Sequence, residues 1–268
     1  MQLSTESVTK SFAGVHALSE VSVEVDKGQV VGVIGPNGSG KTTLVNVISG
    51  VVPPTSGSIC LGEDRWHRRS SHAVARCGVA RTFQTIRLFE EMTVLENVEV
   101  AAASSPRSRG FRRTRVASRE ALAMLGLADR AGEMAKNLSY GLQRRVELAR
   151  AVAGRPDFLL LDEPAAGLNE AESDELLGTL LRLRDAVECG VLMIDHDLRL
   201  IMRGTERIFV LNEGRLLADG GPEQIRNDPR VVASYLGTDA KSAAAEMEAD
   251  PHAGDPSQAG QGSEGGEA

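Results

Sequence analysis

The sequence has few cysteines and no long apolar run. Cys60, Cys77 and Cys189 lie far apart in the chain, without the spacing of a metal site or of a disulfide framework. Three such thiols fit a reducing cytosol best. No run of about 18 apolar residues occurs, so we expect nothing here to span a bilayer. The first residues, MQLSTESVTKSF, also lack the charged and apolar regions of a secretory signal.

Most of the chain also lacks an excess of basic residues. The formal net charge is −7, and residues 240–268, with six acids and one lysine, account for −5 of it. Residues 1–239 therefore carry −2, which does not favour a nucleic-acid partner. Residues 104–119 are the exception, with six arginines and no acid. A solvated loop is the commoner role of such a run, and a contact with phosphate or lipid headgroups is the alternative.

Large apolar side chains are almost absent from residues 240–268, which are mainly Ala, Gly, Ser, Gln and Glu. Such a segment cannot bury enough surface to offset its ordering entropy, so we predict a disordered acidic tail. The other residues have globular proportions, because 41% of the whole chain is hydrophobic and 25% is charged. We predict one domain over residues 1–239, with a helical lobe inserted at about 85–137 and a last helix around 222–236.

Short apolar segments alternate with helical patterns along this domain. The predicted strands are residues 21–25, 29–34, 58–61, 158–161, 191–194, 208–211 and 215–218. Residues 158–161 and 191–194 are continuously apolar, as buried parallel strands require. The last two predicted strands are separated by Asn212, Glu213 and Gly214, which predicts a hairpin. The alternation of strands and helices favours an α/β core.

A phosphate-binding loop follows the strand that ends at Ile34. The GxxxxGK(S/T) pattern is met by Gly35, Pro36, Asn37, Gly38, Ser39, Gly40, Lys41 and Thr42, and Thr43 completes the predicted ATP-binding segment. Its backbone N–H groups and the following helix N-terminus favour phosphate oxygens. We expect Lys41 to contact the β- and γ-phosphates and Thr42 to bind Mg²⁺. The loop alone does not distinguish kinases, GTPases and transport ATPases, and a turn that binds nothing is disfavoured by the flanking strand and helix.

Two carboxylates, Asp162 and Glu163, end the apolar segment FLLLDE. Because side chains alternate along a strand, adjacent carboxylates diverge and serve different roles. We predict that Asp162 holds Mg²⁺ through water and that Glu163 orients or deprotonates the water that attacks the γ-phosphate. A strand that simply ends in polar residues is the alternative, and the phosphate loop disfavours it.

A third segment, LSYGL at 138–142, precedes a helix with apolar residues at 142, 146, 149 and 153. Ser139 lies where a helix N-cap belongs, and Gly141 leaves the backbone accessible. The segment is either a second anion site or an ordinary capped helix.

Taken together, these motifs resemble the nucleotide-binding subunit of an ABC transporter. LSYGL resembles the family's LSGGQ signature, with Tyr140 in place of a glycine and Leu142 in place of the glutamine, while Ser139 and Gly141 remain. The sequence AGLN at 166–169 resembles the D-loop. Gln84 in RTFQ, His196 in MIDHD and Phe12 in KSFAGVHAL match the Q-loop, the switch histidine and the adenine-stacking aromatic. The resemblance covers residues 1–239.

The resemblance implies a fold and a mechanism. The fold is a P-loop ATPase core of the α/β class, with an N-terminal antiparallel β subdomain and an inserted α-helical subdomain. Two such domains pair head to tail around ATP, so that Ser139 and Gly141 contact the nucleotide of the opposite subunit. Glu163 and His196 are then the catalytic residues. Thr42, Gln84 and Asp162 hold Mg²⁺.

Within the family, the wording of several segments is most similar to subunits for branched-chain amino acid uptake, a group that also serves urea and other small polar solutes. This implies integral-membrane permease subunits, a related or identical second ATP-binding subunit, an extracytoplasmic solute-binding protein and no nucleic acid. The expected location is the cytoplasmic face of the cell membrane. Residues 86–89 are expected either to contact the permease or to belong to the core of the lobe.

Three alternatives remain at this point. One is the ATPase subunit of a lipid or lipopolysaccharide exporter. Another is a soluble ABC ATPase of DNA repair or ribosome function, although such proteins typically have coiled-coil insertions or two cassettes. The third is a P-loop small-molecule kinase, which would leave LSYGL and His196 without a role.

Overall fold

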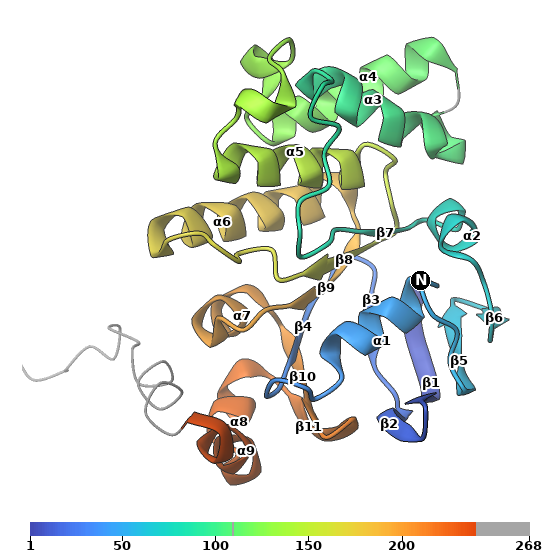
Figure 1. Ribbon diagram of the computed structural model, residues 1–268, viewed down its shortest axis with the longest axis vertical. Helices are drawn as coiled ribbons and strands as arrows, with labels where there is room; N and C mark the ends of the chain where they lie inside the picture. The colour runs from blue at the N-terminus through green and yellow to red at the C-terminus, as the bar shows by residue number, and fades with distance from the viewer. Residues whose placement is uncertain (109, 240–268) are drawn as a thin grey trace, which may run out of the picture.

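Two β-sheets and a group of helices build the fold (Figure 1). The computed structural model describes residues 1–108 and 110–239. The predicted disordered tail at 240–268 lies outside the described residues. Within the described part of the chain, no helix is both long and apolar enough to cross a membrane.

The N-terminal sheet is antiparallel. It contains β1 (Gln2–Phe12), β2 (Val15–Val21), β3 (Glu24–Asp26), β5 (Ser56–Leu61) and β6 (Asp64–Trp66), in the order β2-β1-β5-β6, with β3 also paired to β1. The single strand predicted at 21–25 is wrong, because residues 22–23 separate β2 from β3 and belong to neither strand. The Thr5 hydroxyl donates to the Val21 carbonyl and accepts from the Val23 N–H, so it satisfies the backbone at this break.

The main sheet has the order β11-β10-β4-β9-β8-β7. Its strands are β4 (Val30–Ile34), β7 (Val79–Arg81), β8 (Phe158–Asp162), β9 (Gly190–Ile194), β10 (Arg207–Asn212) and β11 (Arg215–Gly220). The first five are mutually parallel, and β11 returns antiparallel to β10 as the predicted hairpin. All five residues of β4, β8 and β9 are buried, which explains their continuously apolar sequences.

Helices α1 (Lys41–Ile48), α2 (Ser71–Arg76), α6 (Glu170–Val187) and α7 (Leu198–Gly204) belong to this core. The single helix predicted at 222–236 is wrong, because α8 (Pro222–Arg226) and α9 (Pro229–Asp239) are separate. Pro229 begins α9, where its missing N–H costs nothing, but it could not continue α8. Ile225 and Val231 are the buried residues of this region, whereas Val232 is only partly buried.

A helical segment is inserted between β7 and β8 and forms the upper part of Figure 1. It contains α3 (Val94–Ser104), η1 (Pro106–Ser108), α4 (Phe111–Met124), η2 (Ala128–Arg130), η3 (Ala135–Asn137) and α5 (Tyr140–Val152). Val98, Leu122 and Val146 contribute to its buried core. The arginine-rich segment is not a loop throughout, because α4 begins at Phe111. The predicted lobe boundaries at 85 and 137 stay a prediction.

Candidate nucleotide-binding site

Four of the predicted motifs follow the carboxyl ends of neighbouring parallel strands. Residues 35–42 follow β4, His196 lies two residues after β9, Glu163 directly follows β8, and Gln84 lies three residues after β7. These strands are adjacent in the order β4-β9-β8-β7. The motifs therefore meet at the sheet edge where open α/β sheets bind ligands.

Two glycines of the phosphate loop are required by close backbone contacts. A Cβ atom on Gly35 would lie 2.0 Å from the Leu211 carbonyl oxygen, and one on Gly40 would lie 2.6 Å from the Ala17 oxygen. Gly40 also has a φ of +105°, which L side chains rarely adopt. The loop is thus packed between β10 and β2.

Polar groups of the phosphate loop have few partners. Lys41 Nζ donates to the Gly35 and Pro36 carbonyl oxygens at 2.6 and 3.0 Å. Burial lowers the pKa of the Lys41 ammonium, and the carboxylates of Glu163 and Asp162 oppose this shift. Ser39 is 2% exposed, and its hydroxyl has no hydrogen-bond partner within the described part of the chain. An unpartnered buried hydroxyl and an ammonium group in the same loop suit a polyanionic ligand.

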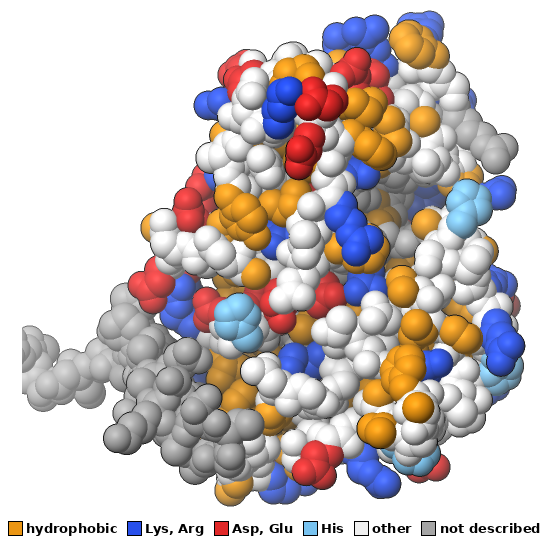
Figure 2. Space-filling model, viewed as in Figure 1, with side chains coloured by type: hydrophobic (Ala, Val, Ile, Leu, Met, Phe, Trp, Pro, Cys, Tyr) orange, Lys and Arg blue, Asp and Glu red, His pale blue; other side chains and the backbone are white. Residues whose placement is uncertain are grey.

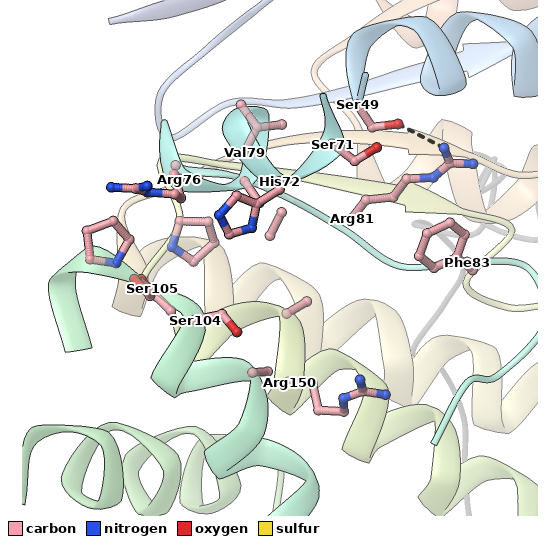
Figure 3. Close-up of a pocket in the computed structure, with 18 of the residues that line it drawn as sticks. Ser49, Ser71, His72, Arg76, Val79, Arg81, Phe83, Ser104, Ser105 and Arg150 are labelled. Atoms are coloured by element: carbon pink, nitrogen blue, oxygen red, sulfur yellow. Dashed lines mark hydrogen bonds between the residues drawn. The ribbon is translucent and has the colours of Figure 1, made fainter. Parts of the chain in front are cut away.

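Arg81, which the sequence reasoning missed, holds Asp162. Its Nη2 lies 2.7 Å from Asp162 Oδ2, and both side chains are nearly buried. Its Nη1 donates to Asn46 Oδ1 and Ser49 Oγ at 2.7 and 2.9 Å, the latter bond being drawn in Figure 3. Arg81 thereby connects β7, α1 and β8. Its position three residues before Gln84, in RTFQ, was the one signal in the sequence.

Glu163 has a different partner from Asp162. Its φ is +50°, a left-handed conformation directly after β8, and its N–H donates to the Ile194 carbonyl at 2.8 Å. Its Oε2 accepts a hydrogen bond of 2.6 Å from Gln84 Nε2. Glu163 and Gln84 are therefore together at the sheet edge, while Asp162 lies beneath it.

His196 is exposed, with 68% of its side chain accessible, and it lies beside the buried Asp195. Asp195 accepts from the Ala165 and Asp197 N–H groups at 3.2 and 3.0 Å and lies 3.4 Å from His196 Nδ1. Burial raises the pKa of Asp195, and those hydrogen bonds oppose the shift. Asp195 was not predicted as a site residue, although it directly precedes His196 in MIDHD.

Ser139 and Gly141 lie apart from the phosphate loop of the same chain. They line a separate hollow with Leu168 and Glu172 at the start of α5. Ser139 occupies the N-cap position, but its side chain makes no capping hydrogen bond. Phe12 is also peripheral: it ends β1, is 47% exposed, and has Lys10 Nζ 4.7 Å from its ring centroid.

The two residues that depart from the signature each have a structural role. Leu142 packs against the main core. The Tyr140 ring lies against Gly167, since a Cβ atom there would be 3.2 Å from Tyr140 Cε1. The Tyr140 hydroxyl accepts a hydrogen bond of 3.3 Å from Arg144.

Arg144 joins α5 to the RTFQ segment. It is 1% exposed, and its guanidinium donates to the Phe83 and Gln84 carbonyls at 2.9 Å each. It also pairs with Glu147 at 2.8 Å, whose other oxygen accepts from the Phe83 N–H at 3.3 Å. Burial raises the pKa of Glu147, and Arg144 opposes the shift. A charged pair three residues apart within a largely apolar helix face was the only signal in the sequence.

Comparisons with known proteins identify the family. The family described as "ABC transporter" matches residues 18–166, and "Branched-chain amino acid ATP-binding cassette transporter" matches residues 215–241. The chain is 41% identical to the high-affinity branched-chain amino acid transport ATP-binding protein LivG of Escherichia coli, covering 88% of this chain and 97% of that protein. Identity to BraF of Pseudomonas aeruginosa, another protein of that description, is 42%, with the same coverage. The lipopolysaccharide export system ATP-binding protein LptB of E. coli is 34% identical, covering 88% of this chain and 98% of that protein.

Solved structures show the same fold. The ADP conformation of MJ1267, an ATP-binding cassette of an ABC transporter, superposes with a TM-score of 0.80 at 31% identity, covering 88% of this chain and 99% of that one. The dimeric structure of MJ0796, a bacterial ABC transporter cassette, has a TM-score of 0.72 at 27% identity, covering 82% and 98%. These matches confirm the predicted α/β P-loop fold. The chain belongs to the ABC transporter family of ATP-binding cassettes.

Proposed function

We propose that this protein hydrolyses ATP with Mg²⁺ and thereby powers an importer of branched-chain amino acids or related small polar solutes. The observation that carries the ATPase proposal is the meeting of the phosphate loop, Glu163, Gln84 and His196 at four adjacent strand ends. The solute class rests on the identity of 41–42% to relatives named for branched-chain amino acid transport, against 34% to the lipopolysaccharide export protein.

Residues 35–43 are proposed to bind the phosphates, with Phe12 stacking on the adenine. The unpartnered Ser39 hydroxyl and the Lys41 ammonium fit a triphosphate. Thr42, Gln84 and Asp162 offer oxygen donors, which Mg²⁺ prefers. Among the described residues, no group of three or more His, Cys, Asp or Glu could hold a metal. Protein Mg²⁺ sites usually add waters and substrate phosphates to one or two carboxylates, which fits a site with Asp162 as its carboxylate. Bound Mg²⁺ would neutralise charge on the β- and γ-phosphates.

Hydrolysis is assigned to Glu163, Gln84 and His196, which follow the carboxyl ends of β8, β7 and β9. Glu163 orients a water and accepts its proton while the water oxygen bonds to the γ-phosphorus and the bond to ADP breaks. Gln84, 2.6 Å from Glu163, places this carboxylate. His196 contacts the γ-phosphate, and Asp195 positions the turn that carries it.

A second subunit completes the site. Ser139 and Gly141 line a hollow that contains no residue of the phosphate loop, which supports a role toward the ATP of another chain. In a head-to-tail pair they would contact the nucleotide of the opposite subunit, which is a related or an identical chain. The dimeric cassette among the similar structures supports this arrangement.

The permease is proposed to bind a hollow of about 420 Å³ between the core and the helical segment (Figure 3). His72, Arg76 and Arg81 lie on its core side, and Ser104 and Arg150 on its helical side. Of residues 86–89, Leu88 packs against the core, Arg87 lines the hollow, and Phe89 is 47% exposed. Leu88 thus belongs to the core, and the permease contact of Arg87 and Phe89 is part of the proposal. Such binding would place the protein peripherally on the cytoplasmic face of the membrane, with a solute-binding protein acting on the opposite face.

The proposal is tested by recovering Glu163→Gln, tagged, from solubilised membranes with ATP present. We expect two hydrophobic permease subunits and a second ATPase subunit to copurify, and the associated solute-binding protein to identify the solute. Copurification of lipopolysaccharide-export components would favour the exporter alternative. Recovery of only soluble, DNA-bound or ribosomal partners would overturn the transport role and leave the ATP chemistry standing.

A further inference from the structure

Helix α4 exposes a row of arginines. Arg112, Arg115, Val116 and Arg119 are spaced so that they lie along one stripe of the helix, and all are exposed. The opposite face of α4 is buried against the rest of the helical segment through Ala121 and Leu122. The stripe is therefore a solvent-facing surface of a helix that is otherwise well anchored.

Acidic side chains do not neutralise this stripe. The one acid on α4, Glu120, pairs with Arg155 at 2.7 Å. Glu99 lies 3.8 Å from Arg115, a loose contact, and Arg112 and Arg119 have no carboxylate within ion-pair distance in the described part of the chain. Arg203 and Arg207, elsewhere on the surface, each have a carboxylate within 3 Å. The positive charge on α4 is thus concentrated in a protein whose residues 1–239 carry a net charge of −2.

Exposed apolar side chains accompany the charge. Phe111, the first residue of α4, is 76% exposed, and Val116 within the stripe is 57% exposed. Basic and hydrophobic side chains are neighbours over the α4 corner at the upper right of Figure 2. Leaving a phenylalanine in water is unfavourable, whereas arginines with an adjacent aromatic suit the interface of a membrane, where the ring enters the headgroup region.

The position of α4 relative to the proposed permease site is also suitable. Ser104, Ser105, Pro106 and Arg107 line the 420 Å³ hollow, and α4 begins four residues after Arg107. If a permease occupies that hollow, the start of α4 lies beside a protein embedded in lipid. This step rests on the proposed function.

We propose that the α4 face, formed by Phe111, Arg112, Arg115, Val116 and Arg119, binds the anionic surface of the membrane next to the permease. Guanidinium groups form paired hydrogen bonds with lipid phosphates. Each arginine near an anionic bilayer strengthens binding about fivefold. Single-stranded nucleic acid offers the same phosphates, but the exposed phenylalanine together with a valine inside the stripe favours the lipid surface.

The test measures binding of the full chain to vesicles by flotation at low ionic strength. One vesicle is phosphatidylcholine alone, and the other adds an anionic fraction of phosphatidylglycerol. We expect binding only to the anionic vesicles. The triple variant Arg112→Gln/Arg115→Gln/Arg119→Gln should bind about 100-fold more weakly. The control Arg130→Gln/Arg203→Gln/Arg215→Gln, with the same change of charge on other surfaces, should bind like the wild type. Phe111→Ser should bind more weakly than the matched Leu216→Ser.

Equal binding by the two triple variants would overturn the proposal, as would absence of wild-type binding to anionic vesicles. Arginine-dependent binding of single-stranded RNA without vesicle binding would also overturn it. The ATPase activity of each variant reports folding, because none of these residues belongs to the nucleotide site. Failure of vesicle binding together with recovery of permease by Glu163→Gln would separate this inference from the proposed function, which would then stand.

Discussion

The two halves of the cassette are held together in different ways. The strand-edge half comprises residues 1–81 and 158–239, and it positions its site through the backbone. Its motifs follow adjacent strands, and Gly35 and Gly40 leave no room for a Cβ atom beside the carbonyls of Leu211 and Ala17. The helical half, residues 82–157, contacts the site through the side chain of Gln84, which donates to Glu163, and Arg144 fixes the Gln84 segment by donating to the Phe83 and Gln84 carbonyls. The geometry of the phosphate loop therefore depends mainly on its glycines and backbone, whereas the connection to the helical half depends on a few side chains.

Glu163→Gln should give the largest effect on the strand-edge half. The amide retains the size of the side chain and can still accept from Gln84, but it cannot take a proton from water. We expect ATP turnover to fall by about 100- to 10,000-fold with ATP affinity kept. The rate of phosphate release measures the turnover, and equilibrium binding of the nucleotide measures the affinity. Glu188→Gln, which also changes a glutamate at positive φ, is the control. Wild-type turnover by Glu163→Gln would remove its catalytic assignment.

Arg144→Met should give the largest effect on the helical half. It leaves Glu147 buried without its partner, which typically costs about 3–5 kcal/mol in the free energy of unfolding. Chemical denaturation measures this cost, and Arg144→Met/Glu147→Leu should recover most of it. Arg145→Met breaks the more exposed pair with Glu175 and should cost about 1 kcal/mol or less. Similar costs for Arg144→Met and Arg145→Met would show that the buried Arg144–Glu147 pair does not hold α5 to residues 83–84.

Lys41→Ala tests whether the loop needs its side chain as well as its backbone. Loss of a charged hydrogen-bond donor to phosphate should weaken ATP binding about tenfold or more. Calorimetric titration with ATP measures the affinity. Lys27→Ala, which removes a lysine paired with Asp157 at 3.2 Å, should leave it unchanged. Unaltered affinity in Lys41→Ala would contradict the phosphate role of Lys41.

Asp195 makes a smaller, pH-dependent contribution. Its pKa is raised by burial in the folded protein, so the folded state holds a proton at pH values where the unfolded chain has lost it. The cost of the ionised carboxylate is present at neutral pH and disappears as the pH falls through the raised pKa. The unfolding free energy of the wild type should therefore improve relative to Asp195→Asn as the pH falls from neutral. A difference that does not change with pH would contradict the shift.

Tyr140→Phe should have the smallest effect. The hydroxyl accepts one long hydrogen bond of 3.3 Å from Arg144, so its removal should cost about 1 kcal/mol or less in unfolding free energy. The ring stays against Gly167. Thermal denaturation measures the change, and a cost as large as that of Arg144→Met would mean that the hydroxyl carries more of the connection than its geometry indicates.

Patterns within single segments predicted most strands of the main sheet, whereas the N-terminal antiparallel subdomain was implied by the family resemblance. We could predict β4, β8 and β9 from their apolar runs and the phosphate loop from its glycine pattern. Both signals lie within a few neighbouring residues. Arg81, Arg144 and Asp195 were missed because their partners are distant: Arg81 reaches Asn46 and Asp162, and Arg144 reaches Phe83. The break between β2 and β3 depends on Thr5 of another strand. By contrast, Pro229 was a local signal for the end of α8.

The chain enters and leaves the helical half only once each, through residues 82–93 and 153–157. A body joined by two short crossings turns most easily about the line between them. Arg81 fixes the end of β7 to α1 and β8, so we expect the first connection to bend after residue 81. Ser139, at the start of α5, and the backbone of Gln84 are expected to move together, because Arg144 of α5 donates a hydrogen bond to the Gln84 carbonyl. A rotation of the helical half would therefore displace Ser139 and Gln84 together, and with Gln84 the hydrogen bond that it donates to Glu163.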